Sequence, residues 1–168
     1  ATALRESKLQ DLTYGDRDSV GLFQQRPSEG WGTQAQIENP VYAATAFYDH
    51  LVQIPGWETM PVTEAAQMVQ RSASPDALPQ GDSEARSLAM ALTGEEPEGI
   101  ACHLDGFGGH APAPSALTMA AATELGAPAL GVRVSTQRGW QVAAWAVAHA
   151  YNYHVTSVSF AGRQWTPS

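Results

Sequence analysis

Lysine is almost absent from this sequence. Lys8 is the only lysine among 168 residues, and the formal net charge is -8. The eight arginines form no basic stripe, since they are scattered over positions 5, 17, 26, 71, 86, 133, 138 and 163. Contacts to phosphate groups need clustered lysines and arginines. The composition therefore argues against nucleic acid as a partner, but not against sugar chains, which are bound by hydrogen bonds and stacking.

Cysteine and metal-binding motifs are equally scarce. Cys102 is the only cysteine, so no disulfide can form within the chain. We expect a buried free thiol there, or a partner cysteine in an upstream segment. The five histidines have no metal-site spacing, and neither Cys-x-x-Cys nor His-Glu-x-x-His occurs. The sequence therefore predicts no metal and no cofactor.

Long apolar runs are missing as well. No run reaches the roughly 18 residues that a membrane span requires, and no secretory signal is visible. The chain opens with Ala-Thr-Ala-Leu-Arg, which is typical of a helix interior without a capping residue ahead of it. We therefore expect that residue 1 is not the natural start and that any signal peptide or anchor lies upstream.

The residues that are present indicate a globular α+β protein. Hydrophobic residues make up 43% of the chain and charged residues 15%. Four helices are expected in an all-α first region, over residues 1–9, 40–53, 63–72 and 84–92. Asn39 and Pro40 are a typical helix start. In that second helix Val41, Ala44, Tyr48 and Leu51 are expected to form the buried face.

A change in composition predicts a domain boundary near residue 98. We expect a first domain over residues 1–98, a Gly- and Pro-rich linker over 99–114 with a possible short strand at 100–104, and a small α/β domain over 115–168. The last domain is expected to contain helices at 116–125 and 137–151 and strands at 130–134 and 155–160.

The front of the chain carries the clearest motif. Glu6 and Ser7 stand near the end of the first expected helix, and Gly-Leu-Phe-Gln follows at residues 21–24. This pattern resembles the lysozyme-like lytic transglycosylases, whose signature is a helix ending in Glu-Ser followed by Gly-Leu-Met-Gln. The chain looks like a divergent actinobacterial member of that superfamily, over residues 1 to about 92. The resemblance implies an N-terminal all-α lysozyme-like domain.

The resemblance implies that Glu6 is the general acid of peptidoglycan glycan-strand cleavage. Such an acid must be protonated near neutral pH, which a partly apolar pocket favours. Leu4, Leu9, Leu22 and Phe23 are the expected pocket residues. The alternative is a solvated glutamate at a helix end.

Six further residues are candidate substrate-binding residues: Ser7, Asp18, Gln24, Gln25, Trp31 and Gln70. Gln24 is the substrate hydrogen-bonding residue that the resemblance implies, with Gln25 beside it, and Ser7 is expected to cap or brace the site. Trp31, between two glycines, is a candidate for stacking on a sugar ring. Asp18 is the better substrate-side carboxylate of the Asp16/Asp18 pair, for which loop structure and calcium binding are the alternatives.

One segment departs from the family pattern. The family has Ala-Tyr-Asn-Ala-Gly in a later helix, where this chain has Val-Gln-Arg-Ser-Ala at residues 69–73. Gln70 or Arg71 is expected to form that wall of the site, and an arginine near Glu6 would favour the charged carboxylate.

Two functions follow from this resemblance. The first is an extracellular or cell-surface enzyme that cleaves peptidoglycan glycan strands. The alternative is a catalytically inactive protein that binds peptidoglycan or a partner in an envelope complex. Residues 140–165 resemble a small C-terminal domain of other actinobacterial cell-wall proteins with a reduced peptidase-type fold, and we interpret them as a binding module.

Overall fold

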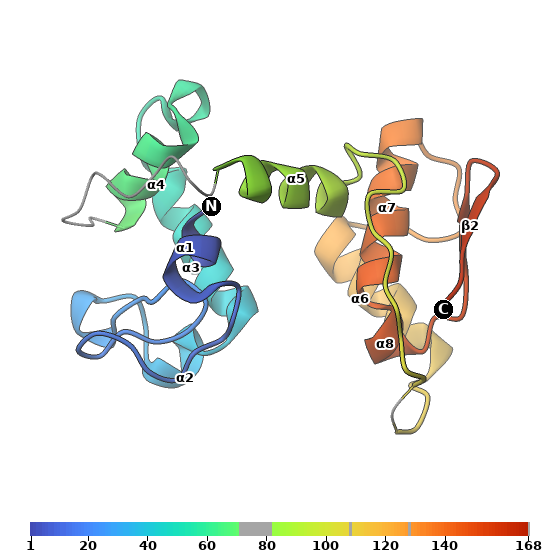
Figure 1. The fold of residues 1–168 in the computed structure, drawn as a ribbon, viewed down its shortest axis with the longest axis horizontal. Coiled ribbons are helices and arrows are strands. Elements are labelled where there is room, and N and C mark those ends of the chain that lie inside the picture. Colours follow the sequence, from blue (N-terminus) through green and yellow to red (C-terminus); the bar gives the residue numbers. More distant parts are fainter. Residues whose placement is uncertain (71–81, 108, 128, 168) are drawn as a thin grey trace. The chain divides into compact units, whose positions relative to one another are not determined.

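A computed structural model describes residues 1–70, 82–107, 109–127 and 129–167 (Figure 1). Over these residues the protein is α+β, with eight α-helices and one two-stranded antiparallel sheet. The chain divides into two compact units, Ala1–Arg86 and Ser87–Ser168, which we call the N-terminal and C-terminal units. The division falls within helix α5 (Asp82–Thr93).

The N-terminal unit is helical. Its helices are α1 (Thr2–Ser7), α2 (Gln34–Ile37), α3 (Pro40–Leu51) and α4 (Val62–Gln70), with short 3-10 helices η1 (Pro27–Glu29) and η2 (Trp57–Thr59). The expected helices at 1–9, 40–53 and 63–72 are therefore confirmed with shorter bounds, while residues 71–73 lie outside the described part. Helix α2 was not expected, although Thr33 and Gln36 form a reciprocal capping box at its start.

Helix α3 is the centre of this unit's core. The Asn39 side chain accepts hydrogen bonds from the backbone amides of Val41 and Tyr42, which confirms the expected cap. Phe47 stacks on Phe23 with ring centroids 5.0 Å apart. The core residues are Ala3, Phe23, Ala43, Phe47, Leu51, Ala65 and Val69.

The predicted buried face of α3 was wrong apart from Leu51 and the partly buried Ala44. Val41 is 74% exposed and Tyr48 is 61% exposed. Successive residues lie about 100° apart around a helix. Because Phe47 turns into the core against Phe23, its neighbour Tyr48 turns away.

The C-terminal unit contains α6 (Pro114–Leu125), α7 (Thr136–Ala148), α8 (Ala150–Tyr153), β1 (Val158–Phe160) and β2 (Arg163–Trp165). Strands β1 and β2 pair with Val158 opposite Trp165 and Phe160 opposite Arg163. The Ser135 hydroxyl caps α7 by accepting a hydrogen bond from the Arg138 amide. A core of Ala121, Ala129, Trp145 and Ala146 joins α6 to α7.

Two predicted strands of this region were wrong. Residues 100–104 and 130–134 are extended or irregular and pair with no strand among the described residues. A strand is stabilised by hydrogen bonds to a neighbouring strand. The expected strand at 155–160 obtains such a neighbour through the turn at residues 161–162 and forms over its second half as β1.

In the described part of the chain, every helix is too short or too polar to cross a lipid bilayer.

Candidate functional site

A groove of about 600 Å³ opens on the N-terminal unit. It is lined mainly by polar side chains that come from α1, the loop after it, the turn at residues 24–26, the end of α3 and the end of α4. The lining residues are Glu6, Asp16, Arg17, Ser19, Gln24, Gln25, Arg26, Glu29, Trp31, His50, Val69 and Gln70. Five of the seven predicted site residues are therefore brought together: Glu6, Gln24, Gln25, Trp31 and Gln70.

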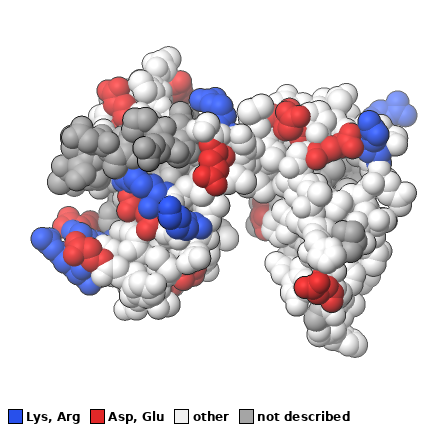
Figure 2. Space-filling view, viewed as in Figure 1, with Lys and Arg blue, Asp and Glu red and all other residues white. Residues whose placement is uncertain are grey.

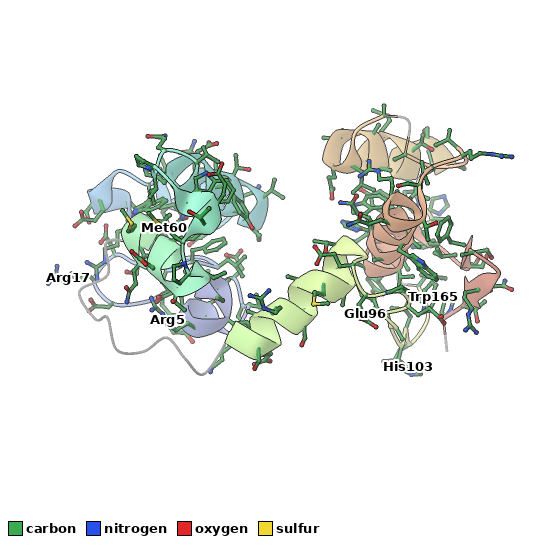
Figure 3. The ribbon with its side chains drawn as sticks, turned by 90° about the horizontal axis from the view of Figure 1, so that it is seen from above. Arg5, Arg17, Met60, Glu96, His103 and Trp165 are labelled. Atoms are coloured by element: carbon green, nitrogen blue, oxygen red, sulfur yellow. The ribbon has the colours of Figure 1, made fainter. Side chains whose placement is uncertain are left out.

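Glu6 lies in the last turn of α1, and its side chain is 26% exposed. Its Oε1 accepts a hydrogen bond of 2.9 Å from Arg5 Nε, and the Arg5 Nη2 group forms an ion pair with the same oxygen. Figure 3 labels Arg5 on α1 and Arg17 on the loop that follows. Glu6 is thus a partly buried carboxylate whose guanidinium partner among the described residues is Arg5.

The expected apolar pocket around Glu6 was wrong. None of its four predicted members lines the groove. Phe23 is buried in the core, and Leu9 is 51% exposed. The chain leaves α1 through two residues with positive φ, Lys8 at 58° and Leu9 at 62°, so Leu9 does not continue the helix face of Glu6.

Ser7 is buried and lies behind the groove. Its hydroxyl donates to the Leu22 carbonyl at 2.7 Å, and the Ala3 carbonyl lies 3.0 Å from the same oxygen. This contact fixes the end of α1 against the turn at residues 20–25. Ser7 therefore positions the neighbouring Glu6 and does not itself face the groove.

The turn at residues 20–25 presents two glutamines. Val20 and Gln25 form an isolated antiparallel bridge around it. Gly21 has a φ of 75°, and a Cβ atom there would lie 2.4 Å from the Ile37 carbonyl oxygen. Only glycine fits this close approach.

The three glutamines that line the groove differ in their burial and in their hydrogen bonds. Gln24 Nε2 donates to the Tyr14 and Gly21 carbonyls at 3.3 and 3.2 Å. Gln25 is 1% exposed and donates to the Ala43 carbonyl, while its Oε1 has no hydrogen-bond partner among the described residues. Gln70 Nε2 donates to the Phe23 carbonyl at 3.2 Å and so ties α4 to the turn.

Asp18 is not part of the groove lining. Its carboxylate accepts from the Ser28 backbone amide at 2.8 Å and from the Ser28 hydroxyl at 3.0 Å. These two hydrogen bonds, the amide first, hold the pKa of Asp18 below its ordinary value. Asp18 therefore has the loop-structure role that was left open for it.

Arg26 has a similar bracing role on the groove side. Its guanidinium donates to Asp16 Oδ2 at 2.8 Å and to the Ser19 hydroxyl at 3.0 Å. It is therefore paired with Asp16, while Glu6 is paired with Arg5. Arg71, the arginine that the sequence placed near Glu6, lies outside the described residues.

Trp31 forms the aromatic part of the groove. Its ring lies 4.3 Å from the His50 ring, centroid to centroid, and its backbone carbonyl accepts from the Tyr42 hydroxyl. Trp31 is half-buried and packs on the core. One edge of the groove is thus an indole and imidazole pair.

Sequence reasoning missed several groove residues. His50 comes from the end of α3, and nothing in its spacing from Glu6 indicates that the two share a groove. Arg5, which does not line the groove, was also missed as the ion-pair partner of Glu6, because neighbouring helix residues do not normally face each other. Because the Arg5 side chain is long, its guanidinium group still reaches the Glu6 carboxylate.

A metal site is not formed in the described part of the chain. No three His, Cys, Asp or Glu side chains there lie close enough to hold a metal ion together.

Charged side chains of both signs lie next to each other on the visible face of the N-terminal unit (Figure 2).

Comparison with known proteins found no matching family model, no matching curated protein and no matching solved structure.

Proposed function

We propose that the groove of the N-terminal unit binds peptidoglycan glycan strands and that Glu6 is the general acid that cleaves them. The unit is proposed to be lysozyme-like and to be followed by a small α/β domain. The observation that carries this proposal is the convergence of Glu6 with Gln24, Gln25, Trp31 and Gln70 in one groove. These residues come from four separate stretches of the chain.

The groove has the chemistry and size that a sugar chain requires. The side-chain oxygens of Gln24 and Gln70 and the Arg17 guanidinium offer hydrogen bonds to hydroxyl and N-acetyl groups, and the Trp31 ring offers an apolar face. Small-molecule sites commonly measure about 300–1,000 Å³, and the groove volume of about 600 Å³ lies within that range.

The proposed reaction needs a single protein carboxyl. Glu6 donates its proton to the glycosidic oxygen between N-acetylmuramic acid and N-acetylglucosamine as the bond to the anomeric carbon breaks. The C6 hydroxyl of the N-acetylmuramic acid that contains this anomeric carbon then attacks the carbon and returns its proton to the Glu6 carboxylate. The product is a 1,6-anhydro sugar, and the substrate supplies the group that a second carboxylate provides in most glycosidases.

The ion pair between Arg5 and Glu6 favours a second candidate function. A guanidinium partner competes with the proton that a general acid must carry. With that pair kept intact, the same groove binds peptidoglycan, or a partner of an envelope complex, without cleaving it. For both candidates we propose that the protein acts outside the cell or on its surface.

Digestion of purified peptidoglycan tests the proposal. We expect the wild type to release anhydro-muropeptides, detected by mass spectrometry, and Glu6→Gln to release none. Glu58→Gln is the matched control, because Glu58 is an exposed glutamate on η2 of the same unit that does not line the groove, and we expect it to remain active. Products with reducing ends that vanish in Glu6→Gln would identify a hydrolase that uses the same acid.

Two outcomes separate the candidates. Absence of product with wild type, together with co-sedimentation on the insoluble polymer, would contradict cleavage and support the binding function. An increase in product with Arg5→Gln would show that the ion pair restrains Glu6. If the wild type shows neither binding nor cleavage, both candidates are contradicted.

A further inference from the structure

The C-terminal unit contains a second cavity, of about 180 Å³, that is independent of the groove. It lies between residues 96–101, helix α7 and the β1–β2 hairpin. Its walls are mainly apolar and aromatic: Trp140, Val147, Val158, Phe160 and Trp165. Glu96 and Trp165, labelled in Figure 3, both belong to its lining.

The aromatic wall is held in a defined position. Trp140 and Phe160 meet edge to face with ring centroids 5.3 Å apart. Phe160 packs directly on Gly139, where an added Cβ atom would lie 1.9 Å from the ring. Residues that pair across an antiparallel sheet share one face. The pairing of Val158 with Trp165 therefore places the Trp165 indole on the same face of the hairpin as Phe160.

The charged lining of the cavity has a surplus of carboxylates. Glu98 forms an ion pair with Arg163 at 3.1 Å. Glu96 also lines the cavity, and no ion pair to it is found among the described residues. With two carboxylates and one guanidinium, the lining is net negative, and the C-terminal unit as a whole has five acidic and three basic residues.

Aromatic walls beside a surplus carboxylate are complementary to an organic cation. Ring faces attract cations, with tryptophan the strongest of the side chains. The volume limits the guest to one small group, since a cavity of about 150 Å³ accommodates benzene. A sugar chain is too large for it.

We propose that this cavity binds a small organic cation, with its apolar body against Trp140 and Trp165 and its ammonium group beside Glu96 and Glu98. The cation is either a free amine or the ammonium group of a lysine-like side chain on a peptide. Both sources share the same chemistry, and the site differs from the groove in ligand and location.

Titration of the full-length protein with benzylammonium, followed by NMR of the tryptophan indole N–H signals, tests the proposal. We expect saturable shifts of the Trp140 and Trp165 signals and weaker binding of neutral benzyl alcohol. Glu96→Gln should weaken benzylammonium binding about two- to fivefold, as expected for one exposed charge. Glu95→Gln is the matched control, because Glu95 is the sequence neighbour but does not line the cavity, and it should bind as wild type does.

The outcomes are decisive in either direction. Equal affinity for benzylammonium and benzyl alcohol, no saturable shift, or equal effects of Glu95→Gln and Glu96→Gln would overturn the proposal. A second pair of probes, Nα-acetyl-lysine amide and Nα-acetyl-norleucine amide, distinguishes a peptide side chain from a free amine as the source of the cation. Binding of the lysine probe alone indicates a peptide side chain, whereas binding of benzylammonium but of neither amide indicates a free amine.

Discussion

Ser7 links α1 to the turn that presents Gln24. Its buried hydroxyl donates to the Leu22 carbonyl. Ser7→Ala leaves that carbonyl without its donor, and we expect a loss of about 1–3 kcal/mol in the free energy of unfolding. Urea denaturation followed by circular dichroism measures the loss.

Ser159→Ala is the control for this substitution. Ser159 is exposed on β1, so its replacement should change the free energy of unfolding by no more than about 0.5 kcal/mol. Equal losses in the two variants would show that the contact between Ser7 and Leu22 does not brace the site.

Asp18 gives the loop a pH dependence. The Ser28 amide and hydroxyl lower its pKa in the folded state. A group with a lowered folded pKa stabilises the fold at pH values above its unfolded pKa of about 3.9, and this stabilisation is lost as the pH falls through the folded value. We expect the stability difference between wild type and Asp18→Asn to be present at neutral pH and to vanish in acid. Urea denaturation at a series of pH values measures it, and a difference independent of pH would contradict the assigned hydrogen bonds.

At the scale of the element, the turn at residues 20–25 depends on Gly21. Gly21→Ala places a side chain at a φ of 75° and 2.4 Å from the Ile37 carbonyl oxygen. We expect a loss of about 2 kcal/mol or more in the free energy of unfolding, measured by urea denaturation. Gly30→Ala is the matched control, because Gly30 has a φ of 82° with no atom within 4 Å of the added Cβ. If the two variants lose equal stability, the contact between the turn and Ile37 is not close.

Local signals explain which elements the sequence predicted. Asn39 and Ser135 cap their helices with their own side chains, so those helix starts are encoded within a few residues. The strand expected at 130–134 has β-branched residues but no partner strand in the described part of the chain, and pairing is not a local property. The buried face of α3 depends on the stacking of Phe47 on Phe23, which are 24 positions apart.

The same distinction applies to the candidate site. The Glu-Ser and Gly-Leu-Phe-Gln motifs indicated Glu6, Gln24 and Gln25 because each motif is short and continuous. That His50 lines the groove and that Arg5 is the ion-pair partner of Glu6 depend on how α3 and α1 are oriented. No spacing in the sequence fixes that orientation.

At the scale of the whole molecule, the two units have separate cores and separate cavities. The groove lies entirely in the N-terminal unit, and the aromatic cavity lies entirely in the C-terminal unit. Substitutions in one cavity should therefore leave ligand binding in the other unchanged. We expect Glu96→Gln to bind peptidoglycan as the wild type does. Co-sedimentation with the insoluble polymer measures this binding, and a loss of sedimented protein would show that the two sites are not independent.

The most direct measurement of the central claim is an NMR titration of the ¹⁵N-labelled full-length protein with soluble peptidoglycan glycan fragments. If the groove is the glycan site, the shifted signals will be those of Glu6, Gln24, Gln70 and the Trp31 indole. Signals from the cavity of the C-terminal unit will stay in place. Shifts confined to the C-terminal unit, or no shifts at saturating fragment concentrations, would contradict the assignment of the groove as a glycan-binding site.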